Sequence, residues 1–305
     1  MSASNSGPSG HVYWGYRGWN FSGDGSLNRG LRGGGGVTAL ASGSPSAVAV
    51  DDTHVYWTDP YYGTVNEAPL GGGSVTTLAS GQVGPISVAV DGTNVYWATF
   101  VGGTVNEVPI GGGTVTTLAS GQDYPNSVAA DGTHVYWVNS NYRGSSPGSN
   151  GTVNEVPVGG GSVTTLASGQ TGPWSVAVDS AHVYWVNYGN GTGFNGSVNE
   201  VSLGGGSVTT LASGQSYPIS VAVDGTHVYW VNWSNGTVNK VPIGGGSVTT
   251  LAAGQYHPYS VAVDETHVYW GNWGDGKVNK VPLGGGRVTT LATSGLGGIA
   301  LAVGP

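Results

Sequence analysis

The chain has 305 residues, and only 8% of them are charged, about a third of the usual share of roughly 25%. The formal net charge of -8 argues against a general phosphate-binding surface, so we expect no nucleic-acid partner. There is no cysteine, which excludes disulfides and thiolate metal sites. No run of about 18 apolar residues occurs, so we expect no membrane insertion. The polar segment 1–7 lacks a signal-peptide core, so the chain as written reads as cytoplasmic, or as secreted if a leader was removed.

A four-residue sequence, His-Val-Tyr-Trp, recurs along the chain. It starts at His11, His54, His134, His182, His227 and His267, and Asn94 starts a further copy. Each copy leads into segments resembling Gly-Thr-Val-Asn-Glu, a glycine triplet with Val-Thr-Thr-Leu-Ala, and Pro-x-Ser-Val-Ala-Val-Asp. The copies are spaced 40 to 48 residues apart. A period of this length, made of four short strands, is typical of a β-propeller blade.

The repeat at 86–122 shows the expected strands most clearly. We predict strands at 87–90, 95–97, 104–108 and 115–118, and Asp91 with Gly92 is a two-residue hairpin signal. No segment carries a helical period. Small alanines occupy the first strand, where blades converge on the axis. Bulky Tyr and Trp occupy the second strand, where the blades spread apart and the space between them must be filled.

The two ends of the chain predict a closed ring. The chain starts at a second strand, 11–14, whereas 299–303 matches the first strand at 86–90 and completes blade 1. An open ring would expose unpaired sheet edges. We therefore predict an all-β, single-domain, seven-bladed propeller over 1–305, with four antiparallel strands per blade. The predicted blades are 11–42 plus 299–303, 46–84, 86–122, 126–170, 174–215, 219–255 and 259–295.

The segment 55–59, Val-Tyr-Trp-Thr-Asp, contains the signature of the YWTD propeller family, which the chain resembles. The blades also resemble those of NHL-type and streptogramin (virginiamycin B) lyase-like propellers, through a Pro-x-x-Ile/Val first strand followed by an aromatic second strand. This resemblance implies the propeller fold. YWTD propellers usually have six blades, whereas this chain has seven copies. The catalytic His and Glu group of the lyases matches no motif here, so we carry over no catalytic residue.

The two faces of the predicted ring differ. One face carries the connections from the second to the third strand and from the fourth strand to the next blade. We call this face the top face. On this face the seven loops after the second-strand Trp have 10, 5, 5, 13, 10, 5 and 5 residues, whereas the turns on the bottom face are uniform. We expect the long loops of blades 1, 4 and 5 to face each other across the axis. Variable loops on a fixed scaffold usually carry function.

The top-face loops concentrate aromatic residues next to polar ones. Flat aromatic faces stack on the C–H face of a sugar while polar neighbours bond its hydroxyls, and Tyr and Trp do so at low entropic cost. The alternative is that these rings simply cover the upper ends of the blades. The predicted ligand-binding residues are Arg17, Trp19, Tyr62, Phe100, Tyr124, Tyr142, Arg143, Trp174, Tyr188, Tyr217, Trp233, Tyr256, His257 and Trp273.

Three functions are compatible with this pattern. The leading hypothesis is a non-enzymatic lectin that binds carbohydrate or another small polar ligand, with no cofactor and no metal. The second is a lyase or hydrolase with one axial site, for which His257 is the best catalytic candidate. The third is a protein-interaction scaffold or an engineered repeat protein. Several repeated sites would favour the lectin, and one axial site would favour an enzyme or a single-ligand receptor. The oligomeric state is not indicated.

Other repeated residues are interpreted as structural. We expect the histidine of each repeat to form a hydrogen bond to the preceding turn, and the asparagine of the third strand to pack between blades. The residue after that asparagine is acidic in Glu67, Glu107, Glu155 and Glu200 and basic in Lys240, Lys280 and Arg29. We interpret it as solvated outer-strand charge or, alternatively, as a patch for self-association.

Overall fold

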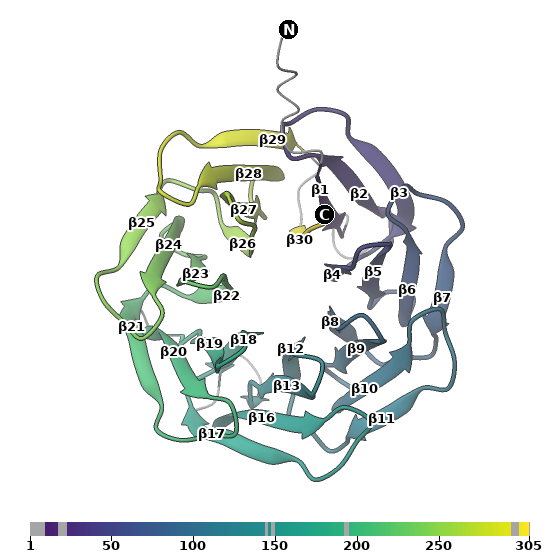
Figure 1. Ribbon diagram of the computed structural model, residues 1–305, viewed down its shortest axis with the longest axis horizontal. Coiled ribbons are helices and arrows are strands. Elements are labelled where there is room, and N and C mark those ends of the chain that lie inside the picture. Colours follow the sequence, from purple (N-terminus) through teal and green to yellow (C-terminus); the bar gives the residue numbers. More distant parts are fainter. Residues whose placement is uncertain are drawn as a thin grey trace, which may run out of the picture.

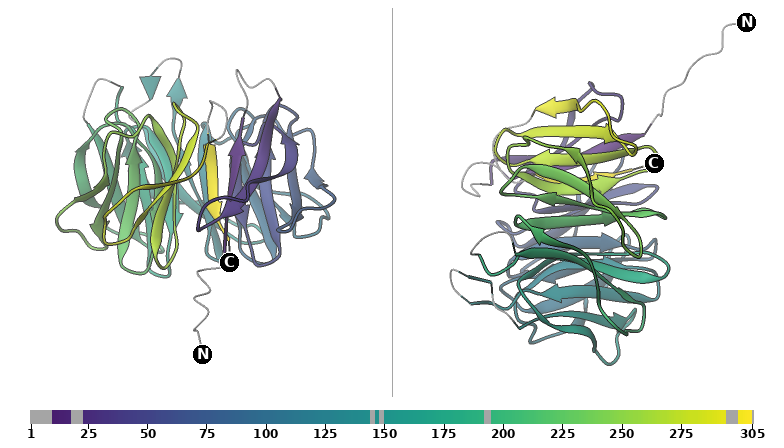
Figure 2. Two further views of the ribbon diagram at one scale, coloured as in Figure 1. Left: turned by 90° about the horizontal axis from the view of Figure 1, so that it is seen from above. Right: turned by 90° about the vertical axis from the view of Figure 1, so that its left-hand side faces the viewer.

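The computed structural model describes residues 10–17, 23–143, 146–147, 150–191, 195–293 and 299–304. These residues form seven four-stranded antiparallel sheets arranged around a central axis (Figure 1). Side views show the ring as a thick disc, with the described C-terminal end on the face opposite to the hairpin β14–β15 (Figure 2). The predicted all-β, seven-bladed propeller is therefore confirmed. No helix long and apolar enough to cross a membrane occurs in the described part of the chain.

The four strands of each blade are ordered from the axis outward. The innermost strands are β4 (Ala47–Val50), β8 (Pro85–Val90), β12 (Pro125–Ala130), β18 (Pro173–Val178), β22 (Pro218–Val223), β26 (Pro258–Val263) and β30 (Ile299–Val303). The second strands are β1 (His11–Tyr16), β5 (His54–Asp59), β9 (Asn94–Thr99), β13 (His134–Asn139), β19 (His182–Asn187), β23 (His227–Asn232) and β27 (His267–Asn272). The third strands are β2 (Gly25–Leu31), β6 (Thr64–Pro69), β10 (Thr104–Pro109), β16 (Gly151–Pro157), β20 (Gly196–Ser202), β24 (Thr237–Pro242) and β28 (Lys277–Pro282). The outer strands are β3 (Thr38–Gly43), β7 (Thr76–Ala79), β11 (Thr116–Ala119), β17 (Thr164–Gln170), β21 (Thr209–Gln215), β25 (Thr249–Ala252) and β29 (Thr289–Thr293). The top-face loop of blade 4 adds a short hairpin, β14 (Tyr142–Arg143) and β15 (Ser146–Pro147), that the sequence analysis did not predict.

Closure of the ring follows the prediction. The C-terminal strand β30 pairs antiparallel with β1, so that Val12 lies opposite Val303 and the sheet order is β3-β2-β1-β30. Arg32, which follows β2, strengthens this junction. Its Nη1 lies 3.3 Å from the Asp264 carboxylate of blade 7, and its guanidinium also donates to the Gly304 carbonyl. Strand pairing and a mostly buried ion pair thus join the two ends of the chain.

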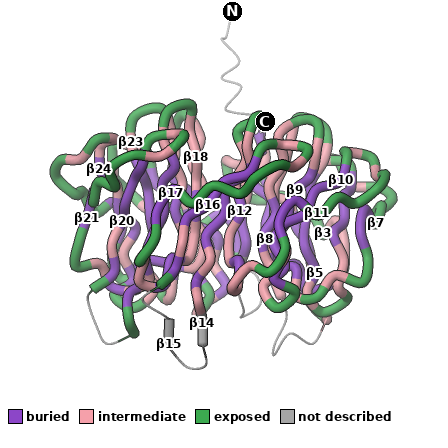
Figure 3. Tube along the Cα trace, turned by 90° about the horizontal axis from the view of Figure 1, so that it is seen from below, coloured by how far each residue is buried: buried purple, intermediate pink, exposed green. Residues whose placement is uncertain are grey.

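Aromatic side chains fill the space between neighbouring blades. Successive residues of a strand point to opposite faces, so the Tyr and Trp of one second strand enter different interfaces. Tyr96 packs in a cluster with Trp137 of the next blade, and Trp97 packs with Tyr56 of the preceding blade. The rings are almost completely buried, and buried residues occupy the interior of the ring (Figure 3). This confirms the predicted filling role of the second strand.

A glutamine from the preceding blade satisfies the buried indole N–H. Trp97 Nε1 donates to Gln82 Oε1 at 2.9 Å. The same bond recurs for Trp137 with Gln122, Trp185 with Gln170, Trp230 with Gln215 and Trp270 with Gln255. Within the described residues Trp14 Nε1 has no partner. Residues 294–298, between blade 7 and the closing strand, contain no glutamine, and neither do residues 42–46 before blade 2, so Trp14 and Trp57 both lack this partner.

In blades 2 to 7 the turn before the second strand is held by its aspartate. Asp51 Oδ1 accepts hydrogen bonds from the backbone N–H groups of Thr53 and His54, and its Oδ2 accepts one from the Tyr56 hydroxyl, each at 2.7 Å. The His54 ring Nδ1 lies 2.8 Å from Thr53 Oγ1. The same histidine contact recurs at His134, His227 and His267, which confirms the structural interpretation in these blades.

The recurrent asparagine of the third strand forms hydrogen bonds within its own blade, and its expected packing between blades stays a prediction. Asn66 Nδ2 donates to Thr64 Oγ1 at 2.8 Å, and its Oδ1 accepts from Thr77 Oγ1 at 3.0 Å. Both partners belong to the same blade, so the amide ties the third strand to the fourth. In blade 7 Lys277 stands at the position of Thr64, and Asn279 Nδ2 has no partner among the described residues.

The charged residue that follows this asparagine was interpreted as solvated outer-strand charge or as a patch for self-association. Both interpretations were wrong for its acidic members. Glu67 and Glu107 are only 5% and 8% exposed, so they are neither solvated nor available as a patch. Glu67 Oε2 accepts the Gly111 N–H of the next blade at 3.3 Å. Two basic members contact the same turn through its carbonyl, since Arg29 Nη1 donates to Leu70 O at 3.0 Å and Lys240 Nζ donates to Leu283 O at 2.7 Å. At these positions the charge changes sign but a contact with the next blade is kept.

Replacing Lys277 with Thr should stabilise the ring by about 1 kcal/mol, because it gives the buried Asn279 amide its missing acceptor. The ion pair that is lost, Lys277 to Asp275 at 2.9 Å, is exposed and contributes little. The free energy of unfolding in urea measures the effect. The matched control is Thr237→Lys in blade 6, which should destabilise by a similar amount. Equal stability of all three proteins would contradict this account.

The aspartate turns should make stability fall at both ends of the pH range. Burial alone would raise the pKa of Asp91, but hydrogen bonds from Tyr96, Asn94 and Thr93 lower it below its usual value. Stability from a depressed carboxyl pKa is present above the unfolded value of about 3.9 and is lost as pH falls through the folded value. Burial and the bond to Asp91 raise the pKa of Tyr96, so its contribution is lost as pH rises beyond about 10.

We therefore expect the unfolding free energy to be highest from about pH 7 to 9 and to decrease on both sides, starting below about pH 6.5 because burial also lowers the pKa values of His11, His227 and His267. Replacing Tyr96 with Phe should lower the plateau by about 1 kcal/mol and lessen the alkaline slope. The exposed Tyr62 provides the control, since Tyr62→Phe should change neither. Urea titrations across the pH range measure all three proteins. A Tyr96→Phe profile that matches the parent would refute this role of the pair.

Candidate functional site

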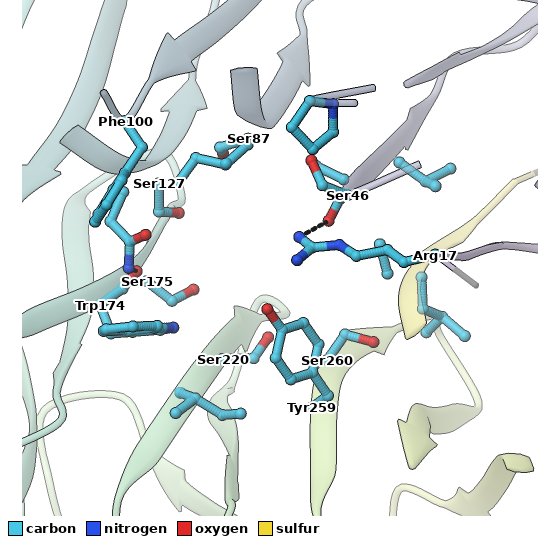
Figure 4. A pocket seen from close by; sticks show the side chains of 18 of the residues that line it. Arg17, Ser46, Ser87, Phe100, Ser127, Trp174, Ser175, Ser220, Tyr259 and Ser260 are labelled. Carbon is cyan, nitrogen blue, oxygen red and sulfur yellow. Dashed lines mark hydrogen bonds between the residues drawn. The ribbon is translucent and has the colours of Figure 1, made fainter. Parts of the chain in front are cut away.

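A pocket of about 780 Å³ opens on the axis at the top face (Figure 4). Its walls are the innermost strands, and its rim is formed by top-face loops that include Pro60, Tyr61, Phe100 and Val101. The volume falls within the range of roughly 300–1,000 Å³ that is usual for small-molecule sites. The site therefore arises from the ring itself, because the innermost strands leave a central space that their side chains only partly fill.

The pocket is lined by the most variable position of an otherwise uniform strand. This position follows the proline that starts the innermost strand, and its described copies in the lining are Ser46, Ile86, Asn126, Trp174, Ile219 and Tyr259. The seventh copy is Ile299, whose side chain lies outside the description. Of these residues only Trp174 was among the predicted ligand-binding residues. Aligning the repeats position by position would have found the others, since the flanking residues hardly change.

The next position carries serine in blades 3 to 7 and alanine in blades 1 and 2, and four of these serines join neighbouring innermost strands. Ser87 Oγ accepts the backbone N–H of Val128 at 2.9 Å. The same bond to the next blade is made by Ser127, Ser175 and Ser220, at 3.1 to 3.3 Å. A hydroxyl that accepts one hydrogen bond can still donate its own proton. The serines therefore stabilise the ring and also provide polar groups on the pocket wall.

Arg17 is the only charged side chain among the described residues that line the pocket. It follows β1 and extends toward the middle of the space (Figure 4). Its Nη2 donates to the backbone carbonyl of Ser46 at 3.2 Å, and its Cζ lies 5.9 Å from the centroid of the Tyr259 ring. A cation over an aromatic face is attracted by the ring's quadrupole, so both contacts hold the guanidinium in place.

Trp174 reaches into the pocket from the opposite side (Figure 4). The Asn126 amide donates to its carbonyl at 3.0 Å, and the Tyr188 ring packs against its indole with centroids 5.5 Å apart. Tyr217 packs in turn on Tyr188 at 4.6 Å. We call these three rings, Trp174, Tyr188 and Tyr217, the Trp174 series. It leads from the pocket outward over the top face.

A second group of rings starts at Tyr259, and we call it the Trp233 series. Trp233 lies edge-on to Tyr259 at 6.1 Å and stacks on His257 at 4.5 Å. Trp273 contacts Trp233 at 5.4 Å, and Tyr256 contacts His257 at 5.1 Å. Both series join the loop after a second strand to the loop that enters the next blade. Aromatic contacts between neighbouring blades thus continue from the core onto the top face.

The predicted site residues separate into three groups. Arg17, Phe100 and Trp174 line the pocket, whereas the two series place Tyr188, Tyr217, Trp233, Tyr256, His257 and Trp273 on the surrounding rim. Tyr124 packs on Phe100 at 5.0 Å, and Tyr62 packs on Tyr61 at 4.8 Å. Trp19 lies outside the described residues, as do the side chains of Tyr142 and Arg143. The expected meeting of the long loops also lies outside them.

His257 does not line the pocket. Its Nδ1 lies 3.2 Å from the Trp233 carbonyl, and its ring stacks on the indole of the same residue. The described pocket lining contains neither a carboxylate nor an imidazole. The described residues also contain no group of three or more His, Asp or Glu side chains that could hold a metal ion. The site as described offers aromatic faces, hydroxyls, one amide and one guanidinium.

Three rim aromatics adopt a backbone conformation that favours glycine. Tyr124, Tyr217 and His257 have φ values of 56°, 53° and 54°. Each directly precedes the proline that starts an innermost strand, where blades 3 and 5 carry Gly84 and Gly172 at φ 68° and 62°. A side chain in this region is destabilising by about 1–2 kcal/mol. Strained residues cluster at functional sites, so these rings are candidates for a role beyond covering the blade ends.

Comparison with known proteins shows the fold and no closer relationship. No family model and no curated protein sequence matches the chain. A propeller from a nidogen/laminin complex superposes with a TM-score of 0.62 and 16% identity, covering 96% of this chain and 98% of that one. Virginiamycin B lyase from Staphylococcus aureus gives 0.67 and 11%, covering 83% and 85%. The computationally designed Ika8 protein gives 0.65 and 18%, covering 87% and 80%. The resemblance to YWTD and streptogramin lyase-like propellers predicted from the repeats is thus confirmed for the fold.

The strain at Tyr124 predicts an unusual order of stability. Replacing Tyr124 with Ala or with Gly removes the same ring contact with Phe100, but only Gly relieves the positive φ. We expect the Gly variant to be more stable than the Ala variant by about 1 kcal/mol, the reverse of the usual order. Unfolding in urea measures the difference. The control is Ser46 on the opposite wall, where the ordinary order, Ala above Gly, should hold. An Ala variant of Tyr124 that equals or exceeds the Gly variant would contradict the strain.

Proposed function

We propose that this protein binds carbohydrate through the axial pocket, with one sugar residue inside it. The observation that carries this proposal is the placement of the Trp174 indole opposite Arg17, with the Tyr259 hydroxyl directed between them (Figure 4). A sugar ring has a flat C–H face and a polar edge. This arrangement offers an aromatic face for the first and hydrogen-bonding groups for the second.

The pocket is built to keep these groups in place before a ligand arrives. Asn126 holds the Trp174 backbone while Tyr188 supports its ring, and the Arg17 guanidinium rests on Tyr259 and the Ser46 carbonyl. Rigid positioning favours binding because less conformational freedom is lost when the ligand arrives. The Asn126 carbonyl oxygen and the wall serines add acceptors and donors for sugar hydroxyls.

The geometry favours one ligand rather than one per blade. The lining position carries Ser, Asn, Trp or Tyr in single blades and repeats only as Ile86 and Ile219 among the described lining residues, so the blades do not offer a set of equivalent subsites. A single axial site also suits an enzyme. However, acid–base chemistry needs a converging pair of titratable groups, and the described lining offers neither a carboxylate nor an imidazole. We therefore favour a single-ligand receptor over a lyase or hydrolase.

The exposed rim favours a second candidate, the binding of another protein. Tyr61, Tyr62, Tyr256 and Trp273 are 44% to 60% exposed on the top face. Exposed Tyr and Trp are enriched at protein interfaces. One of the similar propellers was solved in a nidogen/laminin complex, so this fold is compatible with a protein partner. We rank carbohydrate first because the pocket is concave and is lined by the most variable position of the innermost strand.

Truncation of the central platform tests the proposal. Trp174→Ala should weaken binding to the best ligand of a glycan array by about 2 kcal/mol, roughly 30-fold, because it removes the stacking face. Trp174→Phe should retain part of the affinity. Isothermal titration measures both variants. Trp273→Ala, on the exposed rim, is the control and should have a smaller effect on a monosaccharide. An array without a bound glycan, or binding that does not depend on Trp174, would refute the proposal.

A further inference from the structure

We infer that the sugar bound in the axial pocket is acidic, and that Arg17 recognises its carboxylate or sulfate group. This inference rests on the proposed function, since it names the class of carbohydrate for the same pocket. It starts from the charge of the site. The protein as a whole carries a formal charge of -8, yet the one charged side chain in the described pocket lining is a cation.

Two contacts hold the Arg17 guanidinium in a defined position within the pocket. One of its N–H groups is engaged by the Ser46 carbonyl, and the Tyr259 ring lies 5.9 Å from its Cζ. A guanidinium carries several donors in a planar fork, which matches the paired oxygens of a carboxylate or a sulfate. Contacts on one edge and one face orient this fork toward the middle of the pocket (Figure 4).

The backbone of Arg17 is held by the only complete Tyr-Trp-Thr-Asp copy in the chain. The Asp59 carboxylate of that copy is 3% exposed and accepts the Ser44 N–H at 2.7 Å. The Ser44 hydroxyl in turn donates to the Arg17 carbonyl at 2.9 Å. Asp59 also accepts the N–H groups of Tyr61 and Tyr62, at 3.0 and 3.2 Å. One buried carboxylate therefore organises both the arginine and the adjacent rim.

The rest of the lining favours a sugar with one negative charge over a polyphosphate. Phosphate-rich ligands are bound by several cations or by helix N-termini, and the described lining provides a single cation. Ile86, Phe100, Trp174 and Ile219 give it a largely apolar wall. A charge is more strongly attracted in such surroundings than in water. An aromatic platform beside one guanidinium suits a ring that carries one anionic group.

The test compares matched acidic and neutral sugars. The probes are glucuronate-, galacturonate- and sulfate-terminated oligosaccharides with their neutral counterparts, on an array and then by isothermal titration. We expect at least one acidic probe to bind about 10- to 100-fold more tightly than its neutral counterpart, the usual effect of a charged hydrogen bond. Comparing uronates with sulfates identifies which anionic group is read. Added salt should weaken the acidic probe and leave the neutral one nearly unchanged.

Variants separate this inference from the proposed function. Arg17→Gln should abolish the acidic preference by weakening binding of the acidic probe much more than binding of its neutral counterpart, whereas Arg17→Lys should keep part of the preference. The inference would be overturned if acidic and neutral probes bound equally and their binding depended on Trp174 but not on Arg17. The proposal of carbohydrate binding would then still hold. If no sugar binds, or only acidic peptides bind, both proposals fall. Circular dichroism melting checks that each variant remains folded.

Discussion

Every sheet of this ring depends on the aromatic packing between neighbouring blades. Twisted sheets that meet at an axis spread apart with distance from it, and the space between them must be filled to native density. Here the Tyr of one second strand and the Trp of the next fill it, as Tyr96 and Trp137 do. A glutamine from the preceding blade satisfies the buried indole N–H, so this packing leaves few polar atoms without partners.

Because the blades are nearly uniform, each departure from the repeat can be related to a local change in the structure. Where a copy departs from the repeat in the frame, a buried group is left without a partner among the described residues, as Asn279 is beside Lys277 and Trp14 is at the closure. Where the copies depart at the position facing the axis, no bond of the frame is lost, because serines at the next position join the strands. Variation is therefore tolerated at the pocket wall, where it creates a surface with one particular chemistry.

The top face extends the same aromatic contacts beyond the core. The Trp174 and Trp233 series link loops of adjacent blades, and three of the rim aromatics keep a positive φ that glycine adopts without strain in the equivalent loops. Packing alone would be served as well by relaxed residues. The combination of strained rings, a rigid indole and an oriented guanidinium supports the proposal that a ligand binds on this face.

The sequence by itself determined the ring, its seven blades and its closure, because repeat spacing, turn residues and the match of 299–303 to 86–90 are local or directly comparable features. Of the predicted site residues, Arg17, Phe100 and Trp174 line the pocket. The sequence did not predict the burial of Glu67 or the partners of Asn66 and Glu67, because these partners depend on the register of the outer strand and on the turn of the next blade. Only the tertiary structure decided that Ser46, Asn126 and Tyr259 share one pocket, since convergence on the axis joins residues that lie far apart along the chain.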